Sequence, residues 1–345
     1  MSRFPDTIVA RALSCARTLV PAFALAFTAA CGGSGDGVAG PSKSAPKPTP
    51  NFIQLRSDPG DYIGGGASYD YTQANALIKV TASAGHLSVK VTGDQWWFGD
   101  IVMPGGVSFK TGTYANLTRY PFNTPAEGGL DWSGEGRGCN TLSGSVTIDS
   151  VTYTAGDLTA IDLKFEQHCE GGTAALRATI HWRSDDTTGP PGPITPIPST
   201  LWKPDPAFLP ASGNYVLLSS DPGDYIGLGI FQVYTPPASP FTVSSTGSRI
   251  TVDVGGFTGT FESMLGTNPI KVGYYGGLQR FPFNNPLKGG LDFSGNGRGC
   301  NTLTGWFAVD KVVYTGTTMT ALDMRFEQHC EGGPTAIRGA IHWTA

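Results

Sequence analysis

Residues 165–172 read Phe165-Glu166-Gln167-His168-Cys169-Glu170-Gly171-Gly172, and the same eight letters return at 326–333. Around this octapeptide, residues 119–182 align with 280–343 at an offset of 161 without a gap, and 39 of the 64 positions are identical. Further upstream, the segment 57–64 recurs as 220–227 at an offset of 163. This period is far longer than the ~20–50 residues of solenoid repeats, so the sequence predicts a tandem duplication of a whole domain.

Each copy has the apolar pattern of short β-strands. Leu87, Val89 and Val91 alternate with polar residues, matched by 250–254 in the second copy, and 146–154 and 309–315 are rich in alternating β-branched residues. Glycines at close intervals separate these runs, as is typical of sandwiches and barrels. We therefore expect an all-β protein with two tandem antiparallel β-sandwich or partly closed barrel domains, at 51–183 and 213–345. Residues 184–212 contain eight prolines and are expected to be a semi-rigid spacer.

The cysteines follow the duplication. Cys139 and Cys169 belong to the first copy, and Cys300 and Cys330 to the second, with partners 30 positions apart in both. Four cysteines allow three pairings, but two domains separated by a proline-rich linker favour one disulfide within each copy. Such bonds need an oxidising compartment, which an export signal would supply.

The N-terminus carries such a signal. Three arginines precede an uncharged run at 19–30, which is too short for a bilayer-spanning helix, and small residues follow it. Residues 1–30 are therefore predicted to be a signal peptide. The sequence Thr28-Ala29-Ala30-Cys31 resembles a bacterial lipobox, which implies lipid modification of Cys31 and a Gly/Pro-rich tether at 31–50. The resemblance implies an outer-membrane or cell-surface protein, with the membrane as its partner. Plain cleavage after the small residues, with Cys31 incidental, is the alternative.

Composition excludes some classes of function. Charged residues make up 14% of the chain and the formal net charge is −4. Nucleic-acid binding requires clustered Lys and Arg to neutralise phosphates, and the sequence has no basic run. We therefore expect no nucleic-acid partner.

The longest conserved block between the copies also has a family resemblance. The segment Gly136-Arg137-Gly138-Cys139-Asn140-Thr141-Leu142, the octapeptide, and the closing Ile180-His181-Trp182 together resemble a family of uncharacterised exported bacterial β-domains. The second copy repeats these motifs at 297–303, 326–333 and 341–343. The resemblance implies a bacterial, exported setting and assigns no catalytic residue.

A cluster of titratable residues is expected around the hairpin whose turn is Glu170-Gly171-Gly172-Thr173. Side chains alternate between the two faces of a strand, so the polar members should share one face, opposite Cys169. These members are Glu166, His168, Arg177 and His181, repeated as Glu327, His329, Arg338 and His342. One interpretation is a general acid–base cluster, and the other is a polar face held by cross-strand ion pairs. No nucleophile motif accompanies the cluster, so the sequence favours a non-enzymatic role.

A second motif imitates the start of a calcium loop. Oxygen-bearing side chains occupy positions 1, 3 and 5 before a glycine: Asp131, Ser133 and Glu135, then Asp292, Ser294 and Asn296. The glutamate expected at position 12 is missing. A glycine-rich turn before the disulfide explains the motif better than a metal site does, so no cofactor is expected and calcium is the alternative. Arg137 and Arg298 are expected to pair with nearby carboxylates, and residues 58–61, Asp-Pro-Gly-Asp, suit a type II turn.

Aromatic residues distinguish the copies. Trp96 and Trp97 are adjacent, so one of them should face outward from a strand while the other packs in the core. Alignment at an offset of 163 places Gly259 and Thr260 at these positions in the second copy. The divergent block contains Tyr69 and Tyr71 in the first copy, against Phe231, Tyr234, Tyr274 and Tyr275 in the second.

These observations lead to one functional hypothesis and two alternatives. We expect a lipid-anchored binding or adhesion module for a glycan or envelope component, with recognition in the divergent block, because binding residues concentrate where a scaffold tolerates change. A secreted hydrolase that uses the hairpin face and a non-catalytic envelope scaffold are the alternatives. Residues 51–183 and 213–345 are each expected to fold alone.

Overall fold

The computed structural model describes residues 49–345, which form two ten-stranded, nearly closed barrel-like sheets without an α-helix in that range. The signal peptide, Cys31 and most of the tether lie outside the described residues. The first sheet contains β1 (Phe52–Ser57), β2 (Ser68–Thr72), β3 (Leu77–Ser83), β4 (His86–Thr92), β5 (Trp96–Val102), β6 (Gly112–Arg119), β7 (Gly129–Gly134), β8 (Leu142–Thr154), β9 (Asp157–Cys169) and β10 (Leu176–Arg183). The second contains β11 (Tyr215–Ser220), β12 (Phe231–Tyr234), β13 (Phe241–Thr246), β14 (Arg249–Val254), β15 (Phe257–Glu262), β16 (Gly273–Arg280), β17 (Gly290–Gly295), β18 (Leu303–Thr315), β19 (Thr318–Cys330) and β20 (Ile337–Thr344).

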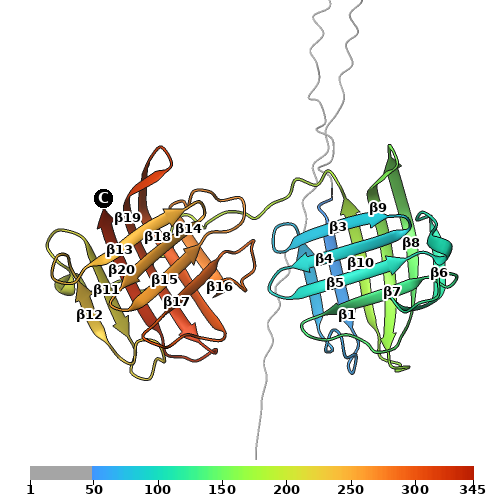
Figure 1. Ribbon diagram of the computed structural model, residues 1–345, viewed down its shortest axis with the longest axis horizontal. Coiled ribbons are helices and arrows are strands. Elements are labelled where there is room, and N and C mark those ends of the chain that lie inside the picture. Colours follow the sequence, from blue (N-terminus) through green and yellow to red (C-terminus); the bar gives the residue numbers. More distant parts are fainter. Residues whose placement is uncertain (1–48) are drawn as a thin grey trace, which may run out of the picture. The chain divides into compact units, whose positions relative to one another are not determined.

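Both sheets have one topology. The first runs β2-β1-β10-β9-β8-β6-β7-β5-β4-β3, and the second repeats this order from β12 to β13 (Figure 1). Neighbouring strands are antiparallel except β6 with β7 and β16 with β17, which pair in parallel over two positions. The first sheet curls until β2 contacts β3, and the Trp97 indole N–H on β5 donates to the Tyr71 hydroxyl on β2 at 2.7 Å. The predicted all-β class and tandem architecture are confirmed.

The octapeptide has a structural role that the sequence did not indicate. The Gln167 side chain is fully buried, accepts the Trp132 N–H at 2.8 Å and donates to the Trp132 carbonyl at 2.9 Å. Strand β7 pairs with β6 over only two residues, so these backbone groups have no strand partner on that side. Gln328 makes the same two bonds to Phe293 in the second sheet. A buried amide therefore completes the sheet where its strands diverge.

Residues 58–61 form the predicted type II turn, and the contacts around it show why the whole segment 57–64 occurs in both copies. Asp61 N–H donates to the Asp58 carbonyl at 2.9 Å, and Gly60 has a positive φ of 92°. The buried Asp61 carboxylate then accepts from the Ser57 hydroxyl and the Gly64 N–H, both at 2.7 Å. A Cβ on Gly64 would lie 2.4 Å from the Ser57 Cβ. Serine, aspartate and glycine at these positions thus form one interlocked turn.

Both disulfides form within their copy, as predicted. Cys139 bonds Cys169 and Cys300 bonds Cys330, with Cα–Cα distances of 5.1 and 5.2 Å. The hairpin turn that follows is also confirmed, since Gly172 N–H donates to the Cys169 carbonyl at 2.8 Å. Disulfides are typical of proteins that fold outside the cytoplasm. Within residues 49–345, no helix is long and apolar enough to cross a membrane.

The linker 184–212 differs from the spacer we expected. Ile194 forms a two-way backbone bridge with Tyr274 of β16, with N–O distances of 3.0 and 2.9 Å. The Trp202 carbonyl accepts from the Arg325 guanidinium on β19 at 2.5 Å. The Phe208 ring packs edge-on against Phe231 of β12, 5.0 Å between centroids. This segment therefore crosses one side of the second sheet, from β16 to β12, in contact with it.

The structure corrects the alignment of the tryptophans. Trp97 pairs with Gly134, and Phe257 pairs with Gly295, the counterpart of Gly134. Trp97 therefore matches Phe257, and Trp96 matches Gly256, in place of Gly259 and Thr260. The cause is a β4–β5 connection that is three residues longer in the first copy. Val91 pairs with Trp97 there, whereas in the second copy Val254 pairs with Phe257.

Candidate functional site

The structure contains the predicted polar face of the hairpin, and its charged side chains form ion pairs and hydrogen bonds with one another. Arg177 donates through Nε to Glu166 and through Nη1 to Asp58, both at 2.7 Å, while the His168 ring lies 3.0 Å from Glu166. The second copy repeats the arrangement with Asp221, Arg338, Glu327 and His329. Asp58, the first residue of the type II turn, is thus a member of this network that the strand pattern did not reveal.

The carboxylates of this network are stabilised in their ionised form. Hydrogen bonds from His168 and Arg177 lower the pKa of Glu166 below its ordinary value. Hydrogen bonds from Arg177 and from the Ala175 N–H lower the pKa of Asp58 in the same way. Both oxygens of each carboxylate already have protein partners. A general acid needs a raised pKa and a free oxygen, so this geometry matches the ion-pair interpretation.

His181 shares the face but belongs to another cluster. Its Nδ1 lies 2.6 Å from Asp162 Oδ1, and its ring stacks on Phe52 with centroids 5.2 Å apart. Asp162 also accepts from Arg183 and from the Ser150 hydroxyl. Partial burial opposes ionisation, but these hydrogen bonds outweigh it and lower the pKa of Asp162 to about 2. His342 pairs with Asp323 in the second copy, so the four-residue cluster expected in each copy is divided in two.

The calcium-like motif does not form a loop of converging oxygens. Asp131 and Ser133 lie on strand β7 and bond each other at 3.1 Å, whereas Glu135 accepts the Trp96 backbone N–H at 2.8 Å. In the second copy, Ser294 likewise bonds Asp292, and Asn296 donates to the Gly255 carbonyl. Among residues 49–345, no three acidic, His or Cys side chains are grouped as metal ligands. Asp131 and Ser133 belong to a strand, and the glycine-rich turn that we expected follows it, since the Arg137 N–H donates to the Gly134 carbonyl at 2.8 Å.

Neither glycine-flanked arginine pairs with a carboxylate within hydrogen-bond distance in the described part of the chain. Arg137 lies 6.0 Å above the Trp97 ring, and Arg298 donates to the Ile226 carbonyl at 2.8 Å. The Arg137 side chain lies beside Gly65, and Arg298 bonds the repeat of the same segment at Ile226. The expected carboxylate pairing is therefore replaced by an aromatic ring and a backbone carbonyl.

Three of the four aromatic candidates in the first copy belong to the interior. Trp97 is fully buried, and its hydrogen-bond partner Tyr71 is almost so. Tyr69 packs edge-on against Trp97, 5.1 Å between centroids, and donates to the Gly64 carbonyl. These residues close the barrel and leave Trp96 as the surface aromatic of the predicted set. The prediction that one tryptophan packs inside and one faces outward is confirmed.

Trp96 has an exposed neighbour that the sequence analysis missed. Phe98 lies two residues along β5, on the same face, and the two side chains are 37% and 44% exposed. Residues two apart on a strand are about 6.8 Å apart, so the rings form a short row. The Lys90 ammonium of β4 lies 5.6 Å from the Phe98 ring centroid. The sequence did carry a signal for this, because side chains alternate along a strand and a buried Trp97 places both Trp96 and Phe98 on the outer face.

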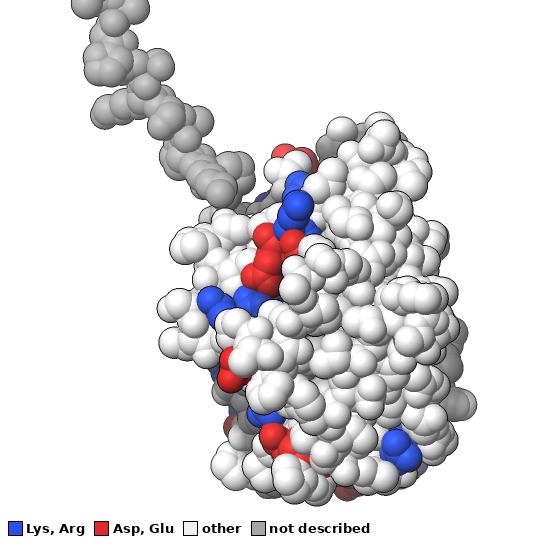
Figure 2. Space-filling view, turned by 90° about the vertical axis from the view of Figure 1, so that its left-hand side faces the viewer, with Lys and Arg blue, Asp and Glu red and all other residues white. Residues whose placement is uncertain are grey.

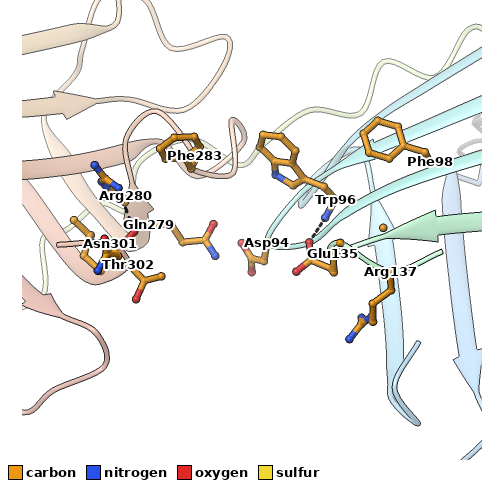
Figure 3. Close-up of a pocket in the computed structure, with 13 residues that line it drawn as sticks. Asp94, Trp96, Phe98, Glu135, Arg137, Gln279, Arg280, Phe283, Asn301 and Thr302 are labelled. Atoms are coloured by element: carbon orange, nitrogen blue, oxygen red, sulfur yellow. Dashed lines mark hydrogen bonds between the residues drawn. The ribbon is translucent and has the colours of Figure 1, made fainter. Parts of the chain in front are cut away.

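These aromatics line a cavity of about 600 Å³. Figure 3 shows Trp96 with Glu135 bonded to its backbone, Arg137 beyond them, and Asp94 from the β4–β5 connection. The remaining lining comes from the second repeat and includes Gln279, Arg280, Phe283, Asn301 and Thr302. Aromatic rings with a few convergent amides, carboxylates and guanidinium groups are the usual composition of a small-molecule site.

The matched surface of the second copy lacks this character. Gly256 and Thr258 occupy the positions of Trp96 and Phe98, and Asp253 occupies that of Lys90. Thr258 donates to Asp253 at 2.6 Å, so the polar groups satisfy each other. On the face shown in Figure 2, most charged side chains form one line in which Lys and Arg (blue) are interspersed with Asp and Glu (red), one further cation lies apart, and uncharged residues cover most of the remainder. This face therefore shows no basic patch suited to phosphates.

Comparison of the chain with protein-family models, curated protein sequences and solved structures finds no match. The family resemblance of the paired motifs therefore stays a prediction.

Proposed function

We propose that this protein is an exported, surface-anchored binding module that recognises a glycan or another envelope component at a site whose exposed aromatic pair belongs to the first repeat. The observation that carries the proposal is the outward pair Trp96 and Phe98 on β5, replaced by Gly256 and Thr258 on an otherwise equivalent strand. Exposed aromatic rings beside polar groups are a feature of ligand sites. Sugars present flat C–H faces to such rings and hydroxyls to amides and carboxylates.

The rest of the cavity supports a sugar-like ligand. Both carboxylates and guanidinium groups are present among its residues, so its charge is balanced and favours no strongly charged ligand. Planar polar side chains such as Gln279, Asn301 and Glu135 suit hydroxyl groups, which both donate and accept hydrogen bonds. Hydrogen bonds to these polar side chains would orient the ligand, and contact with the aromatic rings would contribute affinity.

A glycan array with labelled residues 49–345 tests the proposal. We expect binding to a restricted set of glycans, reduced at least about tenfold in the double variant Trp96→Gly/Phe98→Thr, which installs the residues of the second repeat. The backbone N–H that Glu135 accepts is kept in this variant. Phe122→Ala, which removes an exposed aromatic ring of the first repeat outside the cavity lining, is the control and should bind as the parent does. Absence of any glycan or envelope-extract binding would favour the scaffold alternative.

The anchoring part of the proposal rests on Cys31 and on the small residues before it. Lipidation at Cys31 would hold the protein at a membrane, with the Gly/Pro-rich residues that follow as a tether. We expect Cys31→Ala to move the protein from the membrane fraction to the soluble fraction. A variant that stays fully membrane-bound would refute lipid anchoring and leave the binding proposal intact.

A further inference from the structure

The outer faces of the two sheets differ in burial at matched positions. On β11, β18 and β20 of the second repeat, four outward residues are apolar and buried: Leu217, Trp306, Ala308 and Ala340. Their counterparts in the first repeat are polar and half-exposed: Gln54, Ser145, Thr147 and Thr179. Apolar side chains on the outer face of a barrel are stable only when something covers them.

These four residues do not belong to the barrel interior. The alternate residues Val216, Leu218, Phe307 and Val309 form part of the interior cluster, and side chains on a strand alternate between faces. The cover must therefore lie outside the barrel. The proline-rich segment 190–212 crosses this side of the sheet, with the contacts at Ile194, Trp202 and Phe208 given above. Pro204 lines one small cavity with Arg325 and Ala340, which places the segment directly on this face.

One ion pair common to both repeats shows the effect of the cover. Lys164 pairs with Asp149 at 2.8 Å in the first repeat, and the lysine side chain is 59% exposed. Arg325 pairs with Asp310 at 2.8 Å in the second, and the arginine side chain is 8% exposed. Its Nε and Nη2 groups bond Asp310, and its Nη1 group donates to the Trp202 carbonyl. A lysine has no planar fork with which to bond the carboxylate at two points and the crossing backbone at a third.

We infer that the outer face of the second repeat is a docking surface for an extended, proline-rich segment, and that residues 190–212 fill it as a strap within the same chain. Prolines keep such a segment extended and reduce the entropy lost on docking. Its few backbone bonds leave recognition to the apolar face and to the Arg325 contact. The second folding unit therefore includes the strap, and the matched face of the first repeat is polar and does not call for such a cover.

Limited chymotrypsin digestion of residues 49–345 tests this inference at the Trp202–Lys203 bond. The docked strap should resist cleavage, and two variants that install first-repeat residues should expose it. In Arg325→Lys, which keeps the ion pair with Asp310, we expect cleavage several-fold faster; in the quadruple variant Leu217→Gln/Trp306→Ser/Ala308→Thr/Ala340→Thr, we expect at least about tenfold. The matched control Thr147→Ala/Thr179→Ala alters the first repeat and should leave the rate unchanged.

Circular dichroism of each variant separates strap release from loss of the β fold. If the quadruple variant unfolds, the Arg325→Lys variant decides, because it removes one strap contact and no apolar surface. Equal cleavage rates at Trp202–Lys203 in the parent and in Arg325→Lys, with both folded, would overturn the inference. Rapid cleavage of the parent at the rate of an unstructured peptide would overturn it as well.

Discussion

Replacement of Gln167 by Leu should destabilise the first repeat alone. The Gln167 amide is fully buried and makes both of its strong bonds to Trp132, one to the N–H at 2.8 Å and one to the carbonyl at 2.9 Å. Leucine fills a similar volume but bonds neither group. Each buried backbone group left without a partner costs about 1–3 kcal/mol, and the added apolar contacts recover part of that cost. We therefore expect the free energy of unfolding to fall by about 2–4 kcal/mol.

Hydrogen exchange read by mass spectrometry, at increasing urea concentrations, resolves the two repeats within the full protein. Gln167→Leu should lower the urea midpoint of peptides from β7, β8 and β9 and leave those from β17, β18 and β19 unchanged. Gln328→Leu is the matched control and should give the reverse pattern, since it removes the same two bonds to Phe293. A loss smaller than about 0.5 kcal/mol in both variants would refute the reasoning that these amides complete their sheets.

Two further predictions concern the turn at 57–64 and the stability of the fold at acidic pH. Gly64→Ala would bring a Cβ within 2.4 Å of the Ser57 Cβ and should lower the free energy of unfolding by about 2–4 kcal/mol. Gly189→Ala is the control and should be neutral, because a Cβ there meets nothing within 4 Å. Urea titration of both variants checks this, and equal urea midpoints would contradict it. Asp162 has a pKa near 2 in the fold against an ordinary 3.8, so its ionised form contributes stability above about pH 4 that is lost as the pH falls towards 2. Asp162→Asn should therefore be about 1 kcal/mol less stable than the parent at pH 7, after allowance for solvent screening, and nearly equal to it at pH 2; a difference that does not change with pH would contradict this.

Repetition in the sequence made the architecture predictable. The paired cysteines, the alternating runs and the Glu170-Gly171 turn depend on local chemistry that appears twice, and the structure has all three. The polar face of Glu166 and Arg177 followed from strand alternation alone. Its division into two clusters was not predictable, because Asp58 and Asp162 lie on a turn and a neighbouring strand position that the hairpin pattern does not specify.

The longer β4–β5 connection and the strap were harder to predict. In the divergent block, an alignment at a fixed offset cannot detect three added residues. Only the strand pairing shows that Trp96 corresponds to Gly256. The strap did leave a signal in the sequence. Residues 216–218 and 306–309 are apolar without alternation, which indicates strands buried on both faces, whereas the first repeat has Gln54, Ser145 and Thr147 at the outward positions. Comparison of the repeats face by face would have predicted a cover.

Hydroxyl-radical footprinting of the tryptophans in residues 49–345 tests most directly the central claim that one scaffold presents an open aromatic surface in one repeat and a covered face in the other. Radical attack follows side-chain exposure, which differs strongly among these residues: Trp96 is 37% exposed, Trp97 and Trp132 are 0% exposed, and Trp306 is 8% exposed. We predict that Trp96 is oxidised well before the other three, and that Trp306 becomes reactive when Arg325→Lys or the quadruple variant loosens the strap. Oxidation of Trp306 as fast as Trp96 in the parent protein, or protection of Trp96, would contradict this account.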